Sequence, residues 1–225
     1  MIRRVVTFGS TLIALLSVVS ARESERAAEA TVQLNVATMH AAALSTPRSA
    51  TDAVDAPYLL VSTLGPRRTR AASRLTADSA HRMIRLDQAL GPQPLSTLRL
   101  QPGDSVRVLV SLLEGDSRVG TADEAAANAS LAALTSASAQ RLTDLQRALA
   151  PLSSRGDHWL GSAMMLVTNE GGKTYWRTLD CLASCKVLSR PTSPEIAAEP
   201  TAGVLELTGA GATYHLQLAG RRAAN

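Results

Sequence analysis

The feature that most constrains the fold is a strand-like stretch near the middle of the chain, Asp104 to Asp116. Valine alternates with polar residues at its start, and its later half, Leu109 to Leu113, is apolar on both faces apart from Ser111. Alternation indicates a half-buried strand, whereas a continuous apolar run indicates a strand that is covered on both faces. The stretch therefore predicts a central strand that ends at an acidic tip, Glu114-Gly-Asp116.

Other short segments show the same strand pattern and are separated by turn residues. They cover residues 30–38, 57–64, 69–75, 81–86, 95–100, 159–168, 173–179, 203–208 and 213–218, whereas 181–199 is expected to be irregular. No helix alternates regularly with these strands, as it would in a βαβ protein. The pattern predicts a mainly β protein, an antiparallel eight-stranded β-sandwich (about eight to ten strands).

One segment differs from the rest, because residues 121–150 are rich in alanine and leucine and contain no glycine or proline. Thr121-Ala-Asp-Glu124 matches a capping box, in which the hydroxyl and the carboxylate each bind a free backbone N–H. Five leucines then fall near one helical stripe. We expect one long α-helix or a helical hairpin inserted between two strands, with its apolar stripe packed on the sandwich or on a partner.

The first 21 residues have the pattern of a secretory signal peptide. Arg3 and Arg4 precede an apolar run that is too short to span a membrane comfortably, and Val19-Ser-Ala21 fits a cleavage site. Cleavage near Ala21 would leave a secreted or periplasmic protein without a transmembrane segment; an uncleaved anchor is the alternative. The expected organisation is then a flexible N-terminus at 22–29, a single sandwich domain at 30–219 and a tail at 220–225.

The charge pattern argues against nucleic acid as a partner. The formal net charge is +4, and the basic cluster formed by Arg67, Arg68, Arg70 and Arg74 has no interleaved aromatic residues. Base stacking and a continuous basic face are what a nucleic-acid-binding domain normally presents. We interpret the cluster as a solvated turn.

The two cysteines of the chain are Cys181 and Cys185. In an exported protein an even number of cysteines predicts a disulfide, and a separation of four residues suffices if the segment turns. A free or redox-active pair is the alternative.

Five acidic residues lie in segments that we expect at one end of the sandwich: Asp52, Asp55, Glu114, Asp116 and Asp157. Calcium takes six to eight oxygen ligands, often carboxylates on flexible loops, so these residues are candidate calcium ligands. The alternative is that they are ordinary turn-forming acids. No nucleophile elbow, His-Glu-x-x-His motif or phosphate-binding glycine loop occurs, so we predict no catalytic residues and no enzyme activity.

The order of these features resembles the calcium- and lipid-binding domain of protein kinase C and synaptotagmin, the C-two domain. Asp55-Ala-Pro-Tyr58 is similar to that family's Asp-Pro-Tyr, and Glu114-Gly-Asp116 is similar to its Asp-x-Asp tip. Asp157-His-Trp-Leu-Gly161 stands where the family has Asp-Asp-x-Ile-Gly, and a later Trp-x-x-Leu recurs as Trp176-Arg-Thr-Leu179. The resemblance implies a C-two-like sandwich and calcium as the cofactor.

The expected function is that of an exported, non-catalytic β-sandwich module that recognises a lipid, glycan or protein surface with the help of calcium. Two alternatives remain open. The first is a structural or accessory protein of the cell envelope that contacts its partner through the inserted helix. The second is a hydrolase whose site the sequence does not reveal.

Overall fold

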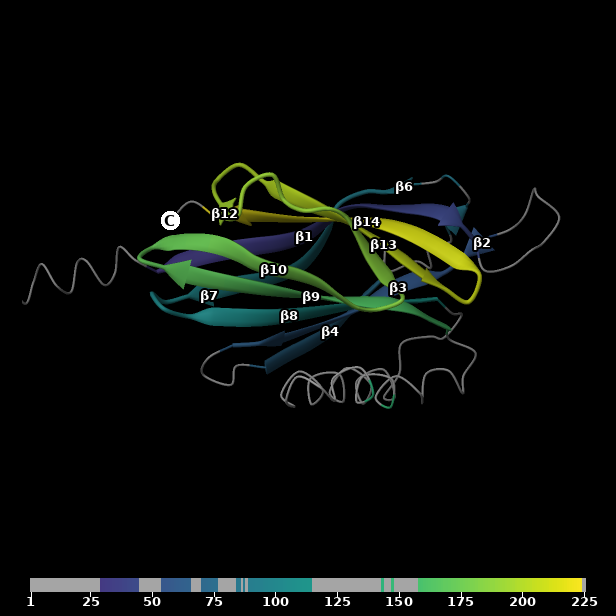
Figure 1. Cartoon of the computed structure of the whole chain (residues 1–225), viewed down its shortest axis with the longest axis horizontal. Helices are drawn as coiled ribbons and strands as arrows, with labels where there is room; N and C mark the ends of the chain where they lie inside the picture. Colours follow the sequence, from purple (N-terminus) through teal and green to yellow (C-terminus); the bar gives the residue numbers. More distant parts are fainter. Residues whose placement is uncertain are drawn as a thin grey trace, which may run out of the picture.

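The computed structural model describes residues 29–44, 54–65, 70–76, 84–85, 87, 89–114, 143, 147 and 158–223. Residues 143 and 147 are helical, and every element for which the structure gives bounds is a β-strand. The strands form two six-stranded sheets and one two-stranded pair, and one of the large sheets curves into a half-barrel. Figure 1 shows β8, β9 and β10 side by side in one layer and β1, β13 and β14 in the other.

The first sheet has the order β11-β13-β14-β1-β6, and β7 also pairs with β1. Its strands are β1 (Ala30–Ala43), β6 (Ala89–Leu90), β7 (Gln93–Leu100), β11 (Cys185–Ser189), β13 (Thr201–Gly209) and β14 (Ala212–Arg222). The N-terminal half of β1 pairs with β7 and its C-terminal half with β6, on the side opposite β14. Strand β11 therefore lies at one edge of this sheet, and β6 and β7 lie at the other.

The second sheet has the order β12-β10-β9-β8-β3-β4. Its strands are β3 (Pro57–Leu64), β4 (Arg70–Thr76), β8 (Ser105–Glu114), β9 (His158–Glu170), β10 (Lys173–Ala183) and β12 (Glu195–Ile196). The two-stranded pair consists of β2 (Val54–Asp55) and β5 (Ile84–Arg85). Strand β8 lies between β9 and β3, which confirms the prediction of a central strand over this stretch.

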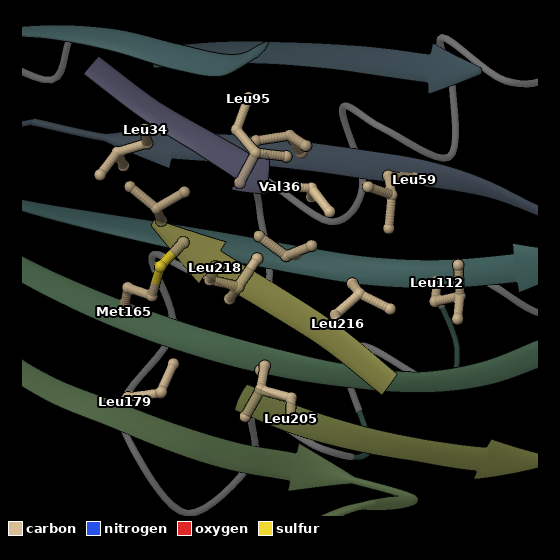
Figure 2. Close-up of a cluster of buried hydrophobic side chains, with 14 of the residues drawn as sticks. Leu34, Val36, Leu59, Leu95, Leu112, Met165, Leu179, Leu205, Leu216 and Leu218 are labelled. Atoms are coloured by element: carbon tan, nitrogen blue, oxygen red, sulfur yellow. The ribbon is translucent and has the colours of Figure 1, made fainter. Parts of the chain in front are cut away.

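The main hydrophobic core fills the space between the two large sheets. Side chains of both sheets project into this space in Figure 2, among them Leu34 of β1, Leu112 of β8 and Met165 of β9. These three residues are at most 1% exposed. Alternate residues of β1 and β14 are buried in the same way, because successive side chains of a strand point to opposite faces. Burial of this apolar surface is the main favourable contribution to folding.

A smaller apolar cluster lies on the other face of the second sheet. It consists of Tyr58, Leu60, Leu109, Leu113 and Met164, which are all buried. This cluster explains why β8 is apolar on both faces, as its sequence indicated.

Two glycines form the hairpin turn between β9 and β10. Gly171 and Gly172 both have positive φ angles, 61° and 87°, which a two-residue hairpin turn of type I′ requires. The Asn169 side chain accepts a hydrogen bond from the Gly172 amide at 3.0 Å, and it donates one to the Leu100 carbonyl at 2.9 Å. Asn169 thereby ties this turn to the end of β7.

The predicted fold class is wrong beyond its mainly β character. The described residues contain fourteen strands, not the eight to ten of a C-two-like sandwich, and no inserted long helix is seen. The segment 121–150, where that helix was expected, lies outside the described residues apart from 143 and 147. A capping box and a leucine stripe are local signals, whereas most helical stability in proteins comes from tertiary packing.

The expectation of an irregular stretch at 181–199 is wrong as well. This stretch contains β11 and β12, which pair with β13 and β10. Lys186 and Leu188 of β11 are both exposed, so apolar and polar residues do not alternate along this strand and its sequence gives no clear strand signal. These strands form because neighbouring strands offer them hydrogen-bonding partners.

The chain passes from one large sheet to the other at a sharp corner between β10 and β11. Ser184 alone separates the two strands and has a positive φ of 47°. A disulfide between Cys181 and Cys185 spans the corner, with a Cα–Cα distance of 5.3 Å that lies in the usual range. The predicted disulfide is confirmed, and such a bond is typical of proteins that fold outside the reducing cytosol.

Replacing both cysteines with serine is expected to lower the free energy of unfolding by about 2 kcal/mol. The closed loop is very short, so the chain-entropy contribution falls at the low end of the range for disulfides. Chemical denaturation of the double variant and the oxidised parent measures the difference. An unchanged free energy of unfolding would show that the corner is held by β-pairing alone.

Among the described residues, no helix has the length and apolar character needed to cross a bilayer.

Candidate functional site

Two of the predicted calcium ligands, Asp55 and Glu114, lie in or beside strands that meet at one end of the second sheet. In register, Glu114 of β8 faces Pro57 of β3 on one side and His158 of β9 on the other. Asp55 belongs to β2, two residues before Pro57. The topology therefore places Asp55 and Glu114 near the same sheet end, as the sequence indicated.

A calcium site is nevertheless not assembled from the residues that the structure describes. Asp52, Asp116 and Asp157 lie outside them, and Glu114 is buried in the strand at 8% exposure instead of projecting from a loop. In the described ranges no three histidine, cysteine, aspartate or glutamate side chains are grouped so that they hold a metal ion. Calcium binding by the five acids stays a prediction.

A second group of titratable side chains lies on the polar outer face of the first sheet. The rings of His40 and His215 stack across β1 and β14 with their centroids 5.9 Å apart. Glu206 of β13 lies 3.2 Å from His215, and Asp87 lies 3.8 Å from His40. These residues form cross-strand pairs on an open strand surface, so they stabilise the sheet without enclosing a ligand.

A concave site lies instead beside β10, where the chain returns from β11 to β12. This β10 pocket has a volume of about 220 Å³. Its lining consists of Trp176, Arg177, Thr178, Leu179, Arg190, Pro191 and Pro194. Apolar walls with a few polar groups are the usual composition of a binding pocket.

A β-bulge in β10 shapes one wall of the β10 pocket. The register with β9 shifts between Trp176 and Thr178, so Arg177 is the additional residue. Without the bulge, residues 176 and 178 would face the core; with it, the second buried position becomes Leu179. The Trp-x-x-Leu spacing seen in the sequence is therefore the signature of this bulge.

Trp176 is fixed in place from three sides. Its indole Nε1 donates a hydrogen bond to Thr201 Oγ1 at 2.9 Å, and its backbone N–H donates one to the Pro194 carbonyl at 2.7 Å. Its ring lies against Gly220 of β14, where an added Cβ would come within 2.6 Å of Cζ2. Gly220 thus leaves the space into which the indole packs.

The opposite wall depends on a second glycine. A Cβ on Gly203 of β13 would meet Leu179 Cδ2 at 2.9 Å and Pro191 Cδ at 3.1 Å. The absence of a side chain at this position lets β10 and the segment after β11 approach the same point of β13. The apolar part of the β10 pocket is therefore a preformed feature of the packing between the sheets.

The two guanidinium groups of the β10 pocket have different surroundings. Arg177 forms a two-pronged ion pair with Glu170, with its Nε 2.8 Å from Oε1, and stacks on the Tyr175 ring at 4.7 Å. Arg190 is exposed, and it forms no ion pair with any residue that the structure describes. Arg190 is therefore the guanidinium that is available to an anionic ligand.

The ion pair with Arg177 lowers the pKa of the Glu170 carboxyl, first through the hydrogen bond from Arg177 and then through one from Thr168. A carboxyl with a lowered folded-state pKa contributes stability above its unfolded pKa and loses it as the pH falls through the folded value. Arg177→Gln is expected to move the Glu170 titration back toward the ordinary value near about 4.3. A carbon-detected NMR pH titration measures the midpoint of the Glu170 titration in the parent and in the Arg177→Gln variant. Equal midpoints in the two proteins would contradict the pairing.

The pocket residues were not among the sites predicted from the sequence. Two of their signals were visible, namely the Trp-x-x-Leu spacing and the two prolines that follow Arg190. The walls of the pocket also depend on Gly203 and Gly220, against which Leu179, Pro191 and Trp176 pack closely. Nothing in the sequence around these two glycines indicates that packing.

Comparison with known proteins supplies no relative for this chain. No family model, no curated protein and no solved structure matches it. The resemblance to the C-two domain stays a prediction from the four short motifs that suggested it.

Proposed function

We propose that this chain is an exported, non-catalytic binding module, and that the β10 pocket binds a ligand with a carboxylate next to an apolar group. The observation that carries this proposal is Arg190, a guanidinium without a carboxylate partner in the described part, at the side of a pocket with apolar walls. The remaining lining groups are indole, leucine, proline, a hydroxyl and the paired Arg177.

The chemistry of the lining favours binding over catalysis. Guanidinium groups stay charged at all physiological pH values, and they hold carboxylates through two parallel hydrogen bonds. A nearby apolar wall lowers the local dielectric and strengthens that attraction. Trp176 and the two prolines offer a rigid surface for the apolar part of the ligand, and little ordering of the protein is needed on binding.

Export is the second part of the proposal. It is supported by the signal-peptide pattern of residues 1–21 and by the Cys181–Cys185 disulfide, which forms and persists in oxidising compartments. These two features together support a secreted or periplasmic location.

Isothermal titration of the full chain with N-acetyl-L-leucine tests the pocket. This compound joins one apolar side chain to a carboxylate and is small enough for about 220 Å³. We expect it to bind about ten-fold to a hundred-fold more tightly than N-acetyl-L-leucinamide, because hydrogen bonds to a charged group contribute about 1.5–3 kcal/mol.

Arg190→Gln is expected to remove this preference for the acid, and Arg99→Gln serves as the matched control. Arg99 is an exposed arginine on β7, at the edge of the first sheet that is opposite β11. Equal affinity for the acid and the amide, or equal losses in the two arginine variants, would refute the assignment of Arg190.

A further inference from the structure

We infer that the ligand of the β10 pocket is the C-terminal end of an extended polypeptide, which adds a short strand to β10. This inference rests on the proposed function and names the partner of the same site. It depends on three observations: an incomplete strand beside β10, the closed ends of that position, and the charge at its side.

In the described part of the chain, the strand position next to β10 is filled over two residues. On the side away from β9, β12 pairs with Thr174 and Tyr175 of β10, and the register ends there. Among the residues that the structure describes, no strand pairs on that side with the following residues of β10, Arg177 to Asp180. An unpaired strand edge offers backbone N–H and C=O groups to an extended peptide, which is how β-strand addition works.

This unpaired stretch coincides with the β10 pocket, because Arg177, Thr178 and Leu179 belong to its lining. Backbone hydrogen bonds and a side-chain pocket are thus available at the same place. In strand addition the backbone bonds supply affinity and the pocket supplies specificity.

Both ends of the stretch are closed by covalent or hydrogen-bonded structure. At one end the Pro194 carbonyl already accepts the Trp176 N–H. At the other end the Cys181–Cys185 disulfide holds the corner into β11. About four residues at 3.3 Å each separate these ends, which is room for a short chain end and too little for a strand that passes through.

The charge selects which end of a polypeptide fits. A C-terminal carboxylate finds its counter-charge in Arg190, whereas an N-terminal ammonium would meet two guanidinium groups in the lining. The last side chain would lie against Trp176, Pro191 and Pro194, which favours an apolar residue at that position. A free carboxylic acid such as a fatty acid shares the carboxylate and the apolar part but has no amide groups to pair with β10.

Four probes separate these sources in titrations against the full chain: the tripeptide acetyl-Thr-Val-Leu as free acid, its C-terminal amide, N-acetyl-L-leucine and decanoate. We expect the tripeptide acid to bind at least ten-fold more tightly than N-acetyl-L-leucine and decanoate, and ten-fold more tightly than its amide. Methylation of the backbone nitrogens of the tripeptide is expected to abolish its advantage over N-acetyl-L-leucine, because the methyl groups remove the N–H donors.

The outcomes distinguish this inference from the proposed function. If the tripeptide acid, N-acetyl-L-leucine and decanoate bind equally, or if N-methylation changes nothing, strand addition is overturned while the carboxylate pocket stands. If none of the acids binds, both are overturned. A tripeptide acid that binds as tightly to the Arg190→Gln variant as to the parent would overturn the placement of the C-terminus.

Discussion

Trp176→Ala is expected to lower the free energy of unfolding by about 3–5 kcal/mol, the usual range for removing a buried aromatic side chain. The indole is 6% exposed and belongs to the main core, so its loss leaves a cavity between the sheets. It also leaves Thr201 without its hydrogen bond from Nε1. Because Trp176 forms part of the β10 pocket, ligand binding should be lost together with stability.

Tyr175→Ala is the matched control for this variant. Tyr175 is the preceding residue of β10, but it points to the solvent-facing side of the sheet and contacts Arg177 through its ring. Losing a cation–π contact at an exposed site lowers stability by about 0.5–1 kcal/mol. Urea denaturation of both variants gives the comparison, and similar losses in the two would contradict the role assigned to Trp176.

Gly220→Ala is expected to lower the free energy of unfolding by about 2–3 kcal/mol, near the upper end of the range for overpacking. The new Cβ would lie 2.6 Å from Trp176 Cζ2 and 3.3 Å from Leu34 Cδ2. The closest atom belongs to a rigid ring whose Nε1 donates a hydrogen bond to Thr201, so it cannot move aside as the end of a flexible side chain would. The substitution adds only one methyl group, and its effect is therefore steric.

A double-mutant cycle with Trp176→Phe tests this mechanism. Phenylalanine lacks the second ring that carries Cζ2, so the space in front of residue 220 is larger in that background. We expect Gly220→Ala to lower stability by at least about 1 kcal/mol less there than in the parent, which is a coupling typical of residues in contact. Additive effects would show that Gly220 is required for a reason other than the approach of Trp176.

The central part of the fold could be predicted from the sequence because the signals there are local and two-sided. Strand β8 is apolar on both faces since it packs on the core with one face and on the Tyr58 cluster with the other. The turn at residues 169–172 is recognisable from its two successive glycines, which readily adopt the positive φ angles that the turn requires. The disulfide followed from the spacing of the two cysteines and the turn between them.

The errors arise where pairing and packing over long sequence distances decide the structure. Strand β11 has no regular pattern of its own and exists because β13 offers it a partner. Glu114 is the last residue of β8 and is buried in register with Pro57 and His158, a burial that its local sequence does not indicate. The local helix signals of 121–150 led to a fold class that the described residues do not support.

The β10 pocket illustrates the same limit for the site. Its two walls come from residues 176–179 and 190–194, and their approach depends on Gly203 and Gly220. Neither glycine lies in a turn or carries any motif. Acidic residues at strand ends are the conspicuous polar feature of the sequence, whereas the β10 pocket is lined mainly by apolar and arginine side chains.

An NMR titration of the ¹⁵N-labelled full chain with N-acetyl-L-leucine tests most directly whether the β10 pocket is the binding site. If the β10 pocket is the binding site, the Trp176 indole N–H, the Arg190 Nε–H and the amides of Thr178 and Leu179 will shift together with one dissociation constant. The amides of the sheet end at Glu114 and His158 should stay unchanged. Shifts centred on that sheet end, or no shifts at millimolar ligand, would contradict the claim that the β10 pocket is the binding site.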